Sequence, residues 1–376
     1  MTDTPQTDFE ILLVTLPGLE GYLYAEVCEA GFRKPKVMSG GVVIRGTWED
    51  VWRANLVLRG ASKVLARIGE FRALHLAQLD KRARKFAWGD HLLPGRSVKV
   101  NVSTNKKSKI YHAGAAQERI EKAIHEAFGA PIAASTEEAD ILIKARFDRD
   151  LVSFSVDTSG TALHKRGHKQ AMGKAPLRET IAAMTLRACG FKRTEPLLDP
   201  MCGSGTYVIE AAEIAANLMA GRGRSFAFKN LVSFDQGAMQ AMKDNWFTRE
   251  TPLRYYGFDR NTDVIASAQA NAKRAGVESA CQFAAQSLSA LTRPEGPPGL
   301  VMVNPPYGTR IGNKTELTAL YASFGAVMRE RFSGWRVGLI TTQQDLAEIT
   351  ELPWLPPSAP IPHGGLKIKL YRTDML

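Results

Sequence analysis

The stretch Leu-Leu-Asp-Pro-Met-Cys-Gly-Ser-Gly-Thr, residues 197–206, decides the fold class. An apolar run that ends in an acidic residue and a glycine-rich turn predicts a strand leading into a helix. Residues 206–218 support that helix, because their apolar positions recur at helical spacing. Glycines in such a turn let the backbone approach a ligand closely, and the free N–H groups of the helix start can bind a carboxylate.

Two common nucleotide-binding motifs do not fit this turn. A dinucleotide fingerprint needs a third glycine three residues after Gly205, where the sequence has Val208. A phosphate-binding loop needs a lysine directly after the turn, and none follows. The pattern therefore disfavours a nicotinamide cofactor, and by itself it remains a weak signal.

The context of the turn is a long alternation of helices and short apolar strands. We expect helices at 177–189, 206–218, 263–275 and 317–332, and strands at 196–199, 254–258, 300–303 and 335–341. Such alternation predicts a parallel, doubly wound α/β sheet. Upstream, two smaller α+β patterns occupy about 9–58 and 97–157.

The strand expected at 254–258 is followed by an acidic side chain. Asp259 would lie at the carboxyl end of that strand, where its carboxylate can accept hydrogen bonds from both ribose hydroxyls. The alternative is a structural role as a helix N-cap near residues 261–263. A nucleoside without a pyrophosphate fits this edge of the sheet best.

A polar and aromatic tetrapeptide, Asn304-Pro305-Pro306-Tyr307, follows the strand expected at 300–303. The prolines leave their carbonyls outside a strand ladder. The Asn304 side-chain oxygen and the Pro305 carbonyl can accept the two hydrogens of an exocyclic amine, and Tyr307 gives the base a stacking surface. The motif predicts a holder for an extruded base, and the alternative is a rigid loop with a buried tyrosine.

The charge distribution points to a polyanion. The net charge is +11, and residues 71–175 alone hold 19 Lys and Arg against 11 Asp and Glu. Three basic clusters lie at 81–85, at 106–109 with Lys106, Lys107 and Lys109, and at 164–169 with Lys165 and Arg166, and they are candidate nucleic-acid contacts. A further candidate is the insertion with Arg222, Arg224 and the rings Phe226 and Phe228. A solvated basic face is the alternative for each cluster, and a packed surface excursion for the last.

Composition limits the remaining classes. Apolar residues make up 44% of the 376 residues, enough for two or three domains with their own cores. We see neither a membrane span nor a signal peptide, so we expect a cytoplasmic protein. The four cysteines lie far apart, which predicts reduced thiols and no metal site.

Together these motifs resemble a known family. The segments 199–206, Asp259 and 304–308 look like the cofactor and target-amine motifs of class I S-adenosylmethionine-dependent methyltransferases that modify exocyclic amines. The segments 40–42, 55–62, 164–167 and 175–180 resemble the bacterial THUMP-domain RNA guanine-N2 methyltransferases of the large-subunit ribosomal RNA type. The similarity runs from about Phe9 to Tyr371.

The resemblance implies a Rossmann-like methyltransferase domain at 161–376, preceded by a ferredoxin-like domain at 1–68 and a THUMP RNA-binding domain at 69–160. It implies S-adenosyl-L-methionine as cofactor and RNA as partner, with Asn304, Pro305, Pro306 and Tyr307 as catalytic residues. The implied cofactor-binding residues are Pro176, Leu177, Asp199, Pro200, Met201, Cys202, Gly203, Ser204, Gly205, Asp259, Arg260 and Ser287. Ser287 departs from the family, which usually has an aspartate there against the adenine amine.

Three functions remain open at this point. The first is methylation of a guanosine N2 amine in RNA, with 23S ribosomal RNA as the expected substrate. The second keeps the chemistry and changes the substrate to a transfer RNA guanine or to an adenine N6 amine in a nucleic acid. The third is an RNA-binding ribosome-assembly factor without turnover.

Overall fold

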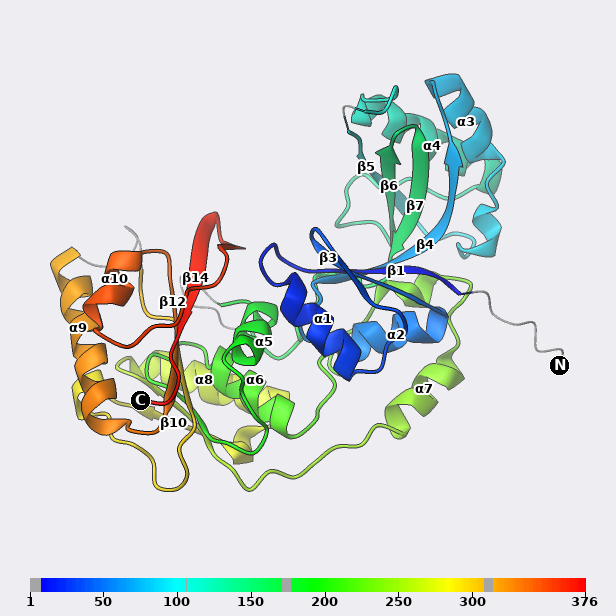
Figure 1. Ribbon diagram of the computed structural model, residues 1–376. Coiled ribbons are helices and arrows are strands. Elements are labelled where there is room, and N and C mark those ends of the chain that lie inside the picture. The colour runs from blue at the N-terminus through cyan, green and yellow to red at the C-terminus, as the bar shows by residue number, and fades with distance from the viewer. Residues whose placement is uncertain (1–7, 106, 171–176, 308–313) are drawn as a thin grey trace. The chain divides into compact units, whose positions relative to one another are not determined.

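The computed structural model describes residues 8–105, 107–170, 177–307 and 314–376, which fold into two compact units (Figure 1). One unit contains Met1–Val14, Val27–Leu163 and Ser225–Trp246. The other contains Thr15–Glu26, His164–Arg224 and Phe247–Leu376. We call them the N-terminal unit and the C-terminal unit.

The N-terminal unit is built on a sheet with strand order β2-β3-β1-β4-β7-β6-β5. Its strands are β1 (Phe9–Val14), β2 (Lys36–Met38), β3 (Gly41–Gly46), β4 (Lys63–Arg72), β5 (Val98–Ser103), β6 (Ile141–Asp148) and β7 (Leu151–Asp157). The helices of this part of the chain are α1 (Glu20–Glu29), whose first residues belong to the C-terminal unit, α2 (Trp48–Val57), α3 (Leu76–Arg84), α4 (Ala113–Phe128) and α7 (Gln236–Asp244).

Strand β4 joins the two α+β patterns that the sequence shows. Its first residues pair with β1 and its later residues with β7, both antiparallel. Strand β4 was not predicted from the sequence, because Lys, Arg and Glu interrupt its apolar residues. The domain boundary expected after residue 68 falls inside this strand, and both patterns share one continuous sheet.

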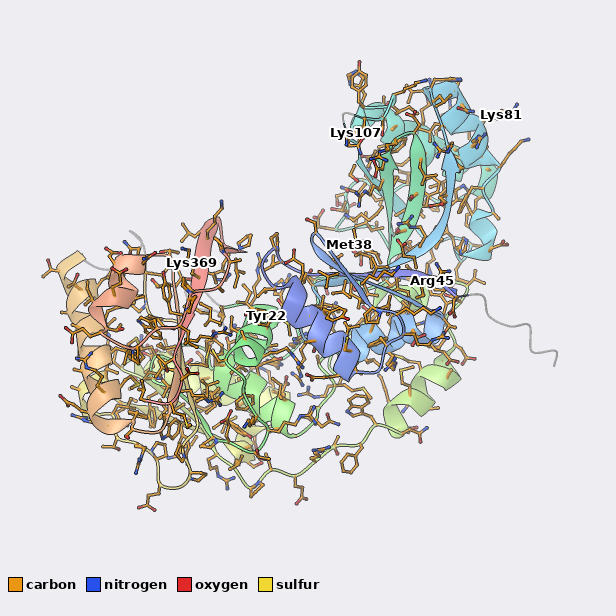
Figure 2. All side chains as sticks on the ribbon, viewed as in Figure 1. Tyr22, Met38, Arg45, Lys81, Lys107 and Lys369 are labelled. Atoms are coloured by element: carbon orange, nitrogen blue, oxygen red, sulfur yellow. The ribbon has the colours of Figure 1, made fainter. Side chains whose placement is uncertain are left out.

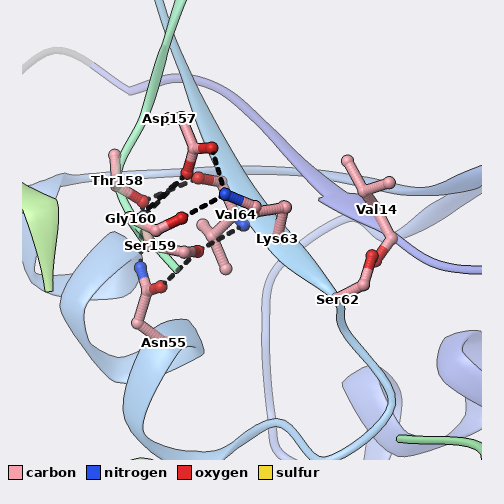
Figure 3. Close-up of polar contacts among 9 residues, drawn as sticks. All are labelled: Val14, Asn55, Ser62, Lys63, Val64, Asp157, Thr158, Ser159 and Gly160. Atoms are coloured by element: carbon pink, nitrogen blue, oxygen red, sulfur yellow. Dashed lines mark hydrogen bonds and ion pairs between the residues drawn. The ribbon is translucent and has the colours of Figure 1, made fainter. Parts of the chain in front are cut away.

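A buried polar network fixes the end of β7 against β4 and α2 (Figure 3). Asn55 donates to the Thr158 hydroxyl at 2.9 Å and accepts from the Ser159 hydroxyl at 2.7 Å. Lys63 forms an ion pair with the buried Asp157 at 2.6 Å. Because each of these buried groups has a partner, the network holds the chain in one path where it leaves the sheet.

The C-terminal unit contains a second sheet, with strand order β10-β9-β8-β11-β12-β14-β13. Its strands are β8 (Leu197–Asp199), β9 (Tyr255–Asp259), β10 (Cys281–Ala285), β11 (Leu300–Val303), β12 (Arg336–Thr341), β13 (Ile361–His363) and β14 (Leu366–Arg372). Its helices are α5 (Glu179–Ala188), α6 (Thr206–Ala215), α8 (Thr262–Ala275), α9 (Lys314–Arg331) and α10 (Gln344–Ile349).

Most of this sheet is parallel, as the alternation predicts, but one end is not. Strands β8 to β12 pair in parallel, whereas β14 runs antiparallel to β12 and β13 antiparallel to β14. The predicted parallel, doubly wound sheet is therefore confirmed from β8 to β12, and the antiparallel strands β14 and β13 extend it at this end. Chain order reverses between β8 and β11, and open α/β sheets bind ligands at the carboxyl ends of strands at such a point.

Helices of the described segments are too short or too polar to cross a membrane. Within the same segments, no group of three or more His, Cys, Asp or Glu is placed to hold a metal ion.

Candidate active site

The glycine-rich turn lies directly after β8, at the switch point of the sheet. Gly203 and Gly205 have φ angles of +52° and +83°, a region that side chains other than glycine rarely adopt. A Cβ atom on Gly205 would approach Phe283 and Ala268 to within 3.0–3.1 Å, whereas one on Gly203 would meet open space. Gly205 therefore serves helix–strand packing, and Gly203 leaves room beside the backbone for a ligand.

Asp199 holds the start of this turn from inside the protein. Its side chain is buried, and one carboxylate oxygen accepts the Met201 N–H at 3.0 Å. Burial raises the pKa of Asp199 well above its usual range, and the negative charge of Asp259 acts in the same direction. The Cys202 N–H donates to the Phe258 carbonyl at 2.8 Å, which ties the turn to β9.

Asp259 bridges the ends of β8 and β9. One oxygen accepts the Gly203 N–H at 3.2 Å, and the other accepts the Asn261 N–H at 3.1 Å. The alternative role as a helix cap is not what the structure shows, because Asn261 caps α8 by accepting the Asp263 N–H. A carboxylate has about four acceptor positions, so about two remain open toward a ligand.

Asn304 follows β11 across the switch point, and its amide carries the most informative orphan atom of the site. The side-chain oxygen of Asn304 is buried and, among the described residues, has no hydrogen-bond partner. A buried acceptor without a donor is costly, roughly 1–3 kcal/mol, so natural proteins rarely keep one without a reason. A ligand with an N–H donor would satisfy it.

Tyr321 supports the tetrapeptide from outside, and Tyr307 is its last residue. The hydroxyl of Tyr321 on α9 lies within hydrogen-bonding distance of the Pro306 carbonyl, at 3.3 Å, and of the Thr341 hydroxyl, at 3.2 Å. Tyr321 therefore holds the turn after β11 against the end of β12. Burial raises the pKa of Tyr307 to about 12, so its half-buried ring stays neutral at physiological pH.

Two supporting residues were not anticipated from sequence. Asn271 on α8 is fully buried and donates to the Ser204 carbonyl at 3.0 Å. Lys169 donates to the Thr206 hydroxyl at 2.8 Å and the Leu177 carbonyl at 3.1 Å, and forms an ion pair with Glu179. The sequence signal for Asn271 is a polar residue on the apolar face of its helix. The only sequence signal for Lys169 is its place in a basic cluster.

The remaining predicted cofactor residues differ in exposure. Leu177, Pro200 and Cys202 are buried, Met201 and Ser204 are half-buried, and Arg260 and Ser287 are exposed. The Ser287 hydroxyl contacts that of Ser289 at 3.1 Å. Pro176 lies outside the described residues.

The basic cluster before α5 packs against the segment after α6. Arg224 donates to the Lys165 carbonyl at 3.1 Å, which places these two predicted RNA contacts side by side. Arg166 is buried and forms an ion pair with the buried Glu210 at 3.4 Å. Its guanidinium therefore neutralises a carboxylate inside the unit, and a contact between Arg166 and RNA stays a prediction. Arg222 is likewise bound internally, to Glu213 and to the Met219 carbonyl.

The two phenylalanines proposed for the RNA path belong to a core. Phe226 and Phe228 are buried and stack on each other in the N-terminal unit, with centroids 5.0 Å apart. Phe228 also packs against Trp52 and Phe234. The packed-excursion alternative holds for these rings. Lys107 and Lys109 are exposed, and Lys106 lies outside the described residues.

The geometry combines a glycine turn, an acidic acceptor and an amide acceptor on adjacent strand ends of a Rossmann-like sheet. The model of the family described as "RMKL-like, methyltransferase domain" matches residues 166–353, which is half of the chain. The chain belongs to this methyltransferase family. A model of the RlmL ferredoxin-like domain matches residues 10–65, in agreement with the ferredoxin-like fold expected at the N-terminus.

Individual relatives agree with this assignment. The chain is 33% identical over 350 residues to the "Ribosomal RNA large subunit methyltransferase K/L" of Vibrio campbellii, covering 90% of this chain and 49% of that protein. The chain thus spans about half the length of this relative. Among solved structures, SMU.472, assigned as a methyltransferase and complexed with SAH, is 25% identical, with a TM-score of 0.86 over 98% of both chains. A predicted N6-adenine-specific DNA methylase from Listeria monocytogenes is 27% identical, with a TM-score of 0.86 over 98% of this chain and 97% of that one.

Proposed function

We propose that this protein uses S-adenosyl-L-methionine to methylate the exocyclic N2 amine of a guanosine in RNA, with 23S ribosomal RNA as the substrate. The observation that carries the proposal is the buried Asn304 oxygen, which has no hydrogen-bond partner among the described residues, together with the open space beside the backbone of Gly203. The name of the Vibrio campbellii relative supports a ribosomal RNA substrate.

The described residues fit the cofactor. Asp259 has acceptor positions left for the ribose hydroxyls, Gly203 leaves its backbone open, and the start of α6 offers N–H groups to the methionine carboxylate. S-adenosylmethionine supplies an electrophilic methyl group on a sulfonium. Its binding would rest on Asp259, Gly203, Ser204 and Gly205, while Asp199 and Cys202 hold the turn from behind.

The protein's part in the reaction is orientation. Asn304 and the Pro305 carbonyl accept the two amine hydrogens, which directs the nitrogen lone pair toward the methyl group, and Tyr307 stacks on the base. With S-adenosylmethionine bound, the amine nitrogen would take the methyl carbon from the sulfonium, the carbon–sulfur electron pair would stay on sulfur, and the nitrogen held by Asn304 and Pro305 would then release one proton to water. The amine becomes acidic only as the new bond forms, so positioning and electrostatics are sufficient without a strong base.

Lys107, Lys109 and Lys165 are the remaining candidates for contacts to the RNA backbone, since their side chains are exposed. Their contribution would be electrostatic, independent of RNA sequence and weakened by salt. We assign residues 69–160 to a THUMP domain as part of this proposal.

The test is methyl transfer from labelled S-adenosylmethionine to unmodified 23S ribosomal RNA, transfer RNA and DNA, offered separately, with the methylated nucleoside identified by mass spectrometry. We expect N2-methylguanosine in ribosomal RNA. N6-methyladenine in DNA would instead assign the substrate that is named for the Listeria monocytogenes protein. Label in transfer RNA would show that transfer RNA, and not ribosomal RNA, is the substrate. No label in any nucleic acid would contradict the proposal and favour a binding role.

A further inference from the structure

The β13–β14 hairpin extends past the edge of the sheet at which the active site lies. The ladder between β12 and β14 ends with the pair Thr341–Lys369. Residues 366–368 continue beyond the end of β12 and pair with β13 (Figure 1). At 3.3–3.4 Å per residue, this extension reaches about 10 Å past β12.

The base of the hairpin is connected to the catalytic tetrapeptide. Thr341, the partner of Lys369, contacts the Tyr321 hydroxyl, which also contacts the Pro306 carbonyl. Because β12 separates β11 from β14 and neighbouring strands lie about 4.8 Å apart, the hairpin rises about 10 Å to the side of Asn304.

The hairpin tip combines an exposed apolar side chain with a cation. Leu366 is 40% exposed. Lys367 is exposed, and in the described part of the chain it has no ion-pair partner. Gly364 and Gly365, with φ angles of +56° and +83°, form the turn and leave open space around it.

Further cations surround the hairpin. Figure 2 shows Lys369 on β14. Lys367, two residues earlier, lies on the same face of the strand, because side chains alternate along a strand. Burial lowers the pKa of His363 on β13, and the positive charges of Arg178 and Lys169 lower it further, so these two cations lie near the hairpin. The carboxylates Asp345 and Glu348 act on Tyr371, two residues after Lys369. Lys367, farther toward the tip, is therefore the less neutralised of the two lysines.

We propose that this hairpin holds the substrate RNA beside the nucleotide that is methylated, with Lys367 on a backbone phosphate and Leu366 against the neighbouring base. The inference rests on the proposed function. Removing a base from its stack leaves the adjacent base with an uncovered face, and apolar wedges cover such faces in other proteins that deform nucleic acids. The excess of cations favours RNA over a protein partner as the occupant.

The test compares Lys367→Gln with Lys273→Gln. Lys273 is exposed and lies in the last turn of α8, which starts at the carboxyl end of β9 and so ends at the opposite edge of the sheet. We expect Lys367→Gln to raise the KM for RNA roughly three- to tenfold and to reduce the slope of log affinity against log salt by about 0.7–0.9. Lys273→Gln should leave both values unchanged, and neither variant should alter cofactor affinity.

A second variant tests the apolar contact. Leu366→Ala should lower the methylation rate of folded RNA severalfold and leave the rate on a short single-stranded RNA with the same target unchanged. Equal effects on both RNAs would assign Leu366 to the fold of the hairpin and overturn its role as a wedge.

The outcomes separate this inference from the proposed function. If the wild type methylates RNA and Lys367→Gln matches Lys273→Gln in KM and salt slope, the hairpin contact is refuted and the proposed function stands. If the wild type methylates no RNA, the proposed function fails. Equilibrium RNA binding then tests the hairpin contact. An unchanged slope of log affinity against log salt in Lys367→Gln overturns the contact, and a reduced slope supports it.

Discussion

Replacing Asp259 by asparagine should weaken cofactor binding strongly. Two of the roughly four acceptor positions of this carboxylate are occupied by the N–H groups of Gly203 and Asn261. About two remain for the ribose hydroxyls, and a hydrogen bond to a charged group contributes roughly 1.5–3 kcal/mol. Asparagine keeps one acceptor oxygen and turns an NH₂ group toward donors, so at least one such bond is lost.

The loss corresponds to a Kd for S-adenosylmethionine about 10- to 150-fold higher, since 1.4 kcal/mol equals a factor of about ten. Isothermal titration calorimetry measures it directly, with S-adenosylhomocysteine as a second ligand. Asp263→Asn is the matched control, because Asp263 is an exposed acid four residues away in the first turn of α8. A Kd for Asp259→Asn within about twofold of the wild type would refute the ribose-binding role, and an equal loss in both variants would point to general electrostatics.

Further predictions concern Ser287, Tyr321, the Arg166–Glu210 ion pair and the dependence of stability on pH. Ser287→Asp should leave methyl transfer intact and tighten cofactor binding, because a carboxylate can accept from the adenine amine; a clear loss of binding by calorimetry would show that this position does not face the adenine. Tyr321→Phe should lower kcat severalfold with an unchanged cofactor Kd, because the Pro306 carbonyl loses its hydroxyl contact; rapid-quench assays measure this, and an unchanged kcat would speak against the support role. Arg166→Met should lower the free energy of unfolding by about 3–5 kcal/mol, because it removes the guanidinium that forms an ion pair with the buried Glu210; urea denaturation tests it, and unaltered stability with weakened RNA binding would support a surface role. Burial raises the pKa of Tyr307 and Cys281 to about 12, so the unfolded state loses these protons first as pH rises. The free energy of unfolding should therefore fall from about pH 9 upward, and less steeply in Tyr307→Phe. A urea midpoint that stays constant over that pH range would contradict the assigned burial.

The parts of the fold that follow local periodicity were predictable from sequence. The helices that became α6 and α8 and the strands β8, β9 and β11 were expected within a few residues, because apolar spacing and the glycine turn determine them locally. Strands β4 and β14 were not expected, since lysine, arginine and glutamate on their open faces interrupt the apolar pattern. Their pairing depends on neighbours far away in the chain, which a local pattern does not contain.

The site shows the same division. Asp259 and Asn304 were predictable because each follows an apolar strand, where the end of the strand fixes the position of the side chain. The burial of Arg166 was not predictable, because composition gives the charge of a residue but not its partner, and the partner Glu210 lies on α6. Asn271, which holds the Ser204 carbonyl, acts through a tertiary contact that no spacing rule predicts.

The most direct test of the central claim is the methyl-transfer rate of Asn304→Ala at saturating S-adenosylmethionine, measured together with the cofactor Kd. Asn245→Ala is the control, because Asn245 is exposed at the end of α7 and belongs to the N-terminal unit, whereas the site lies in the C-terminal unit. The account predicts that Asn304→Ala loses at least about 100-fold in rate with a nearly unchanged Kd, while Asn245→Ala behaves like the wild type. A rate for Asn304→Ala within a few-fold of the wild type would contradict the claim that the Asn304 amide oxygen holds the reacting amine.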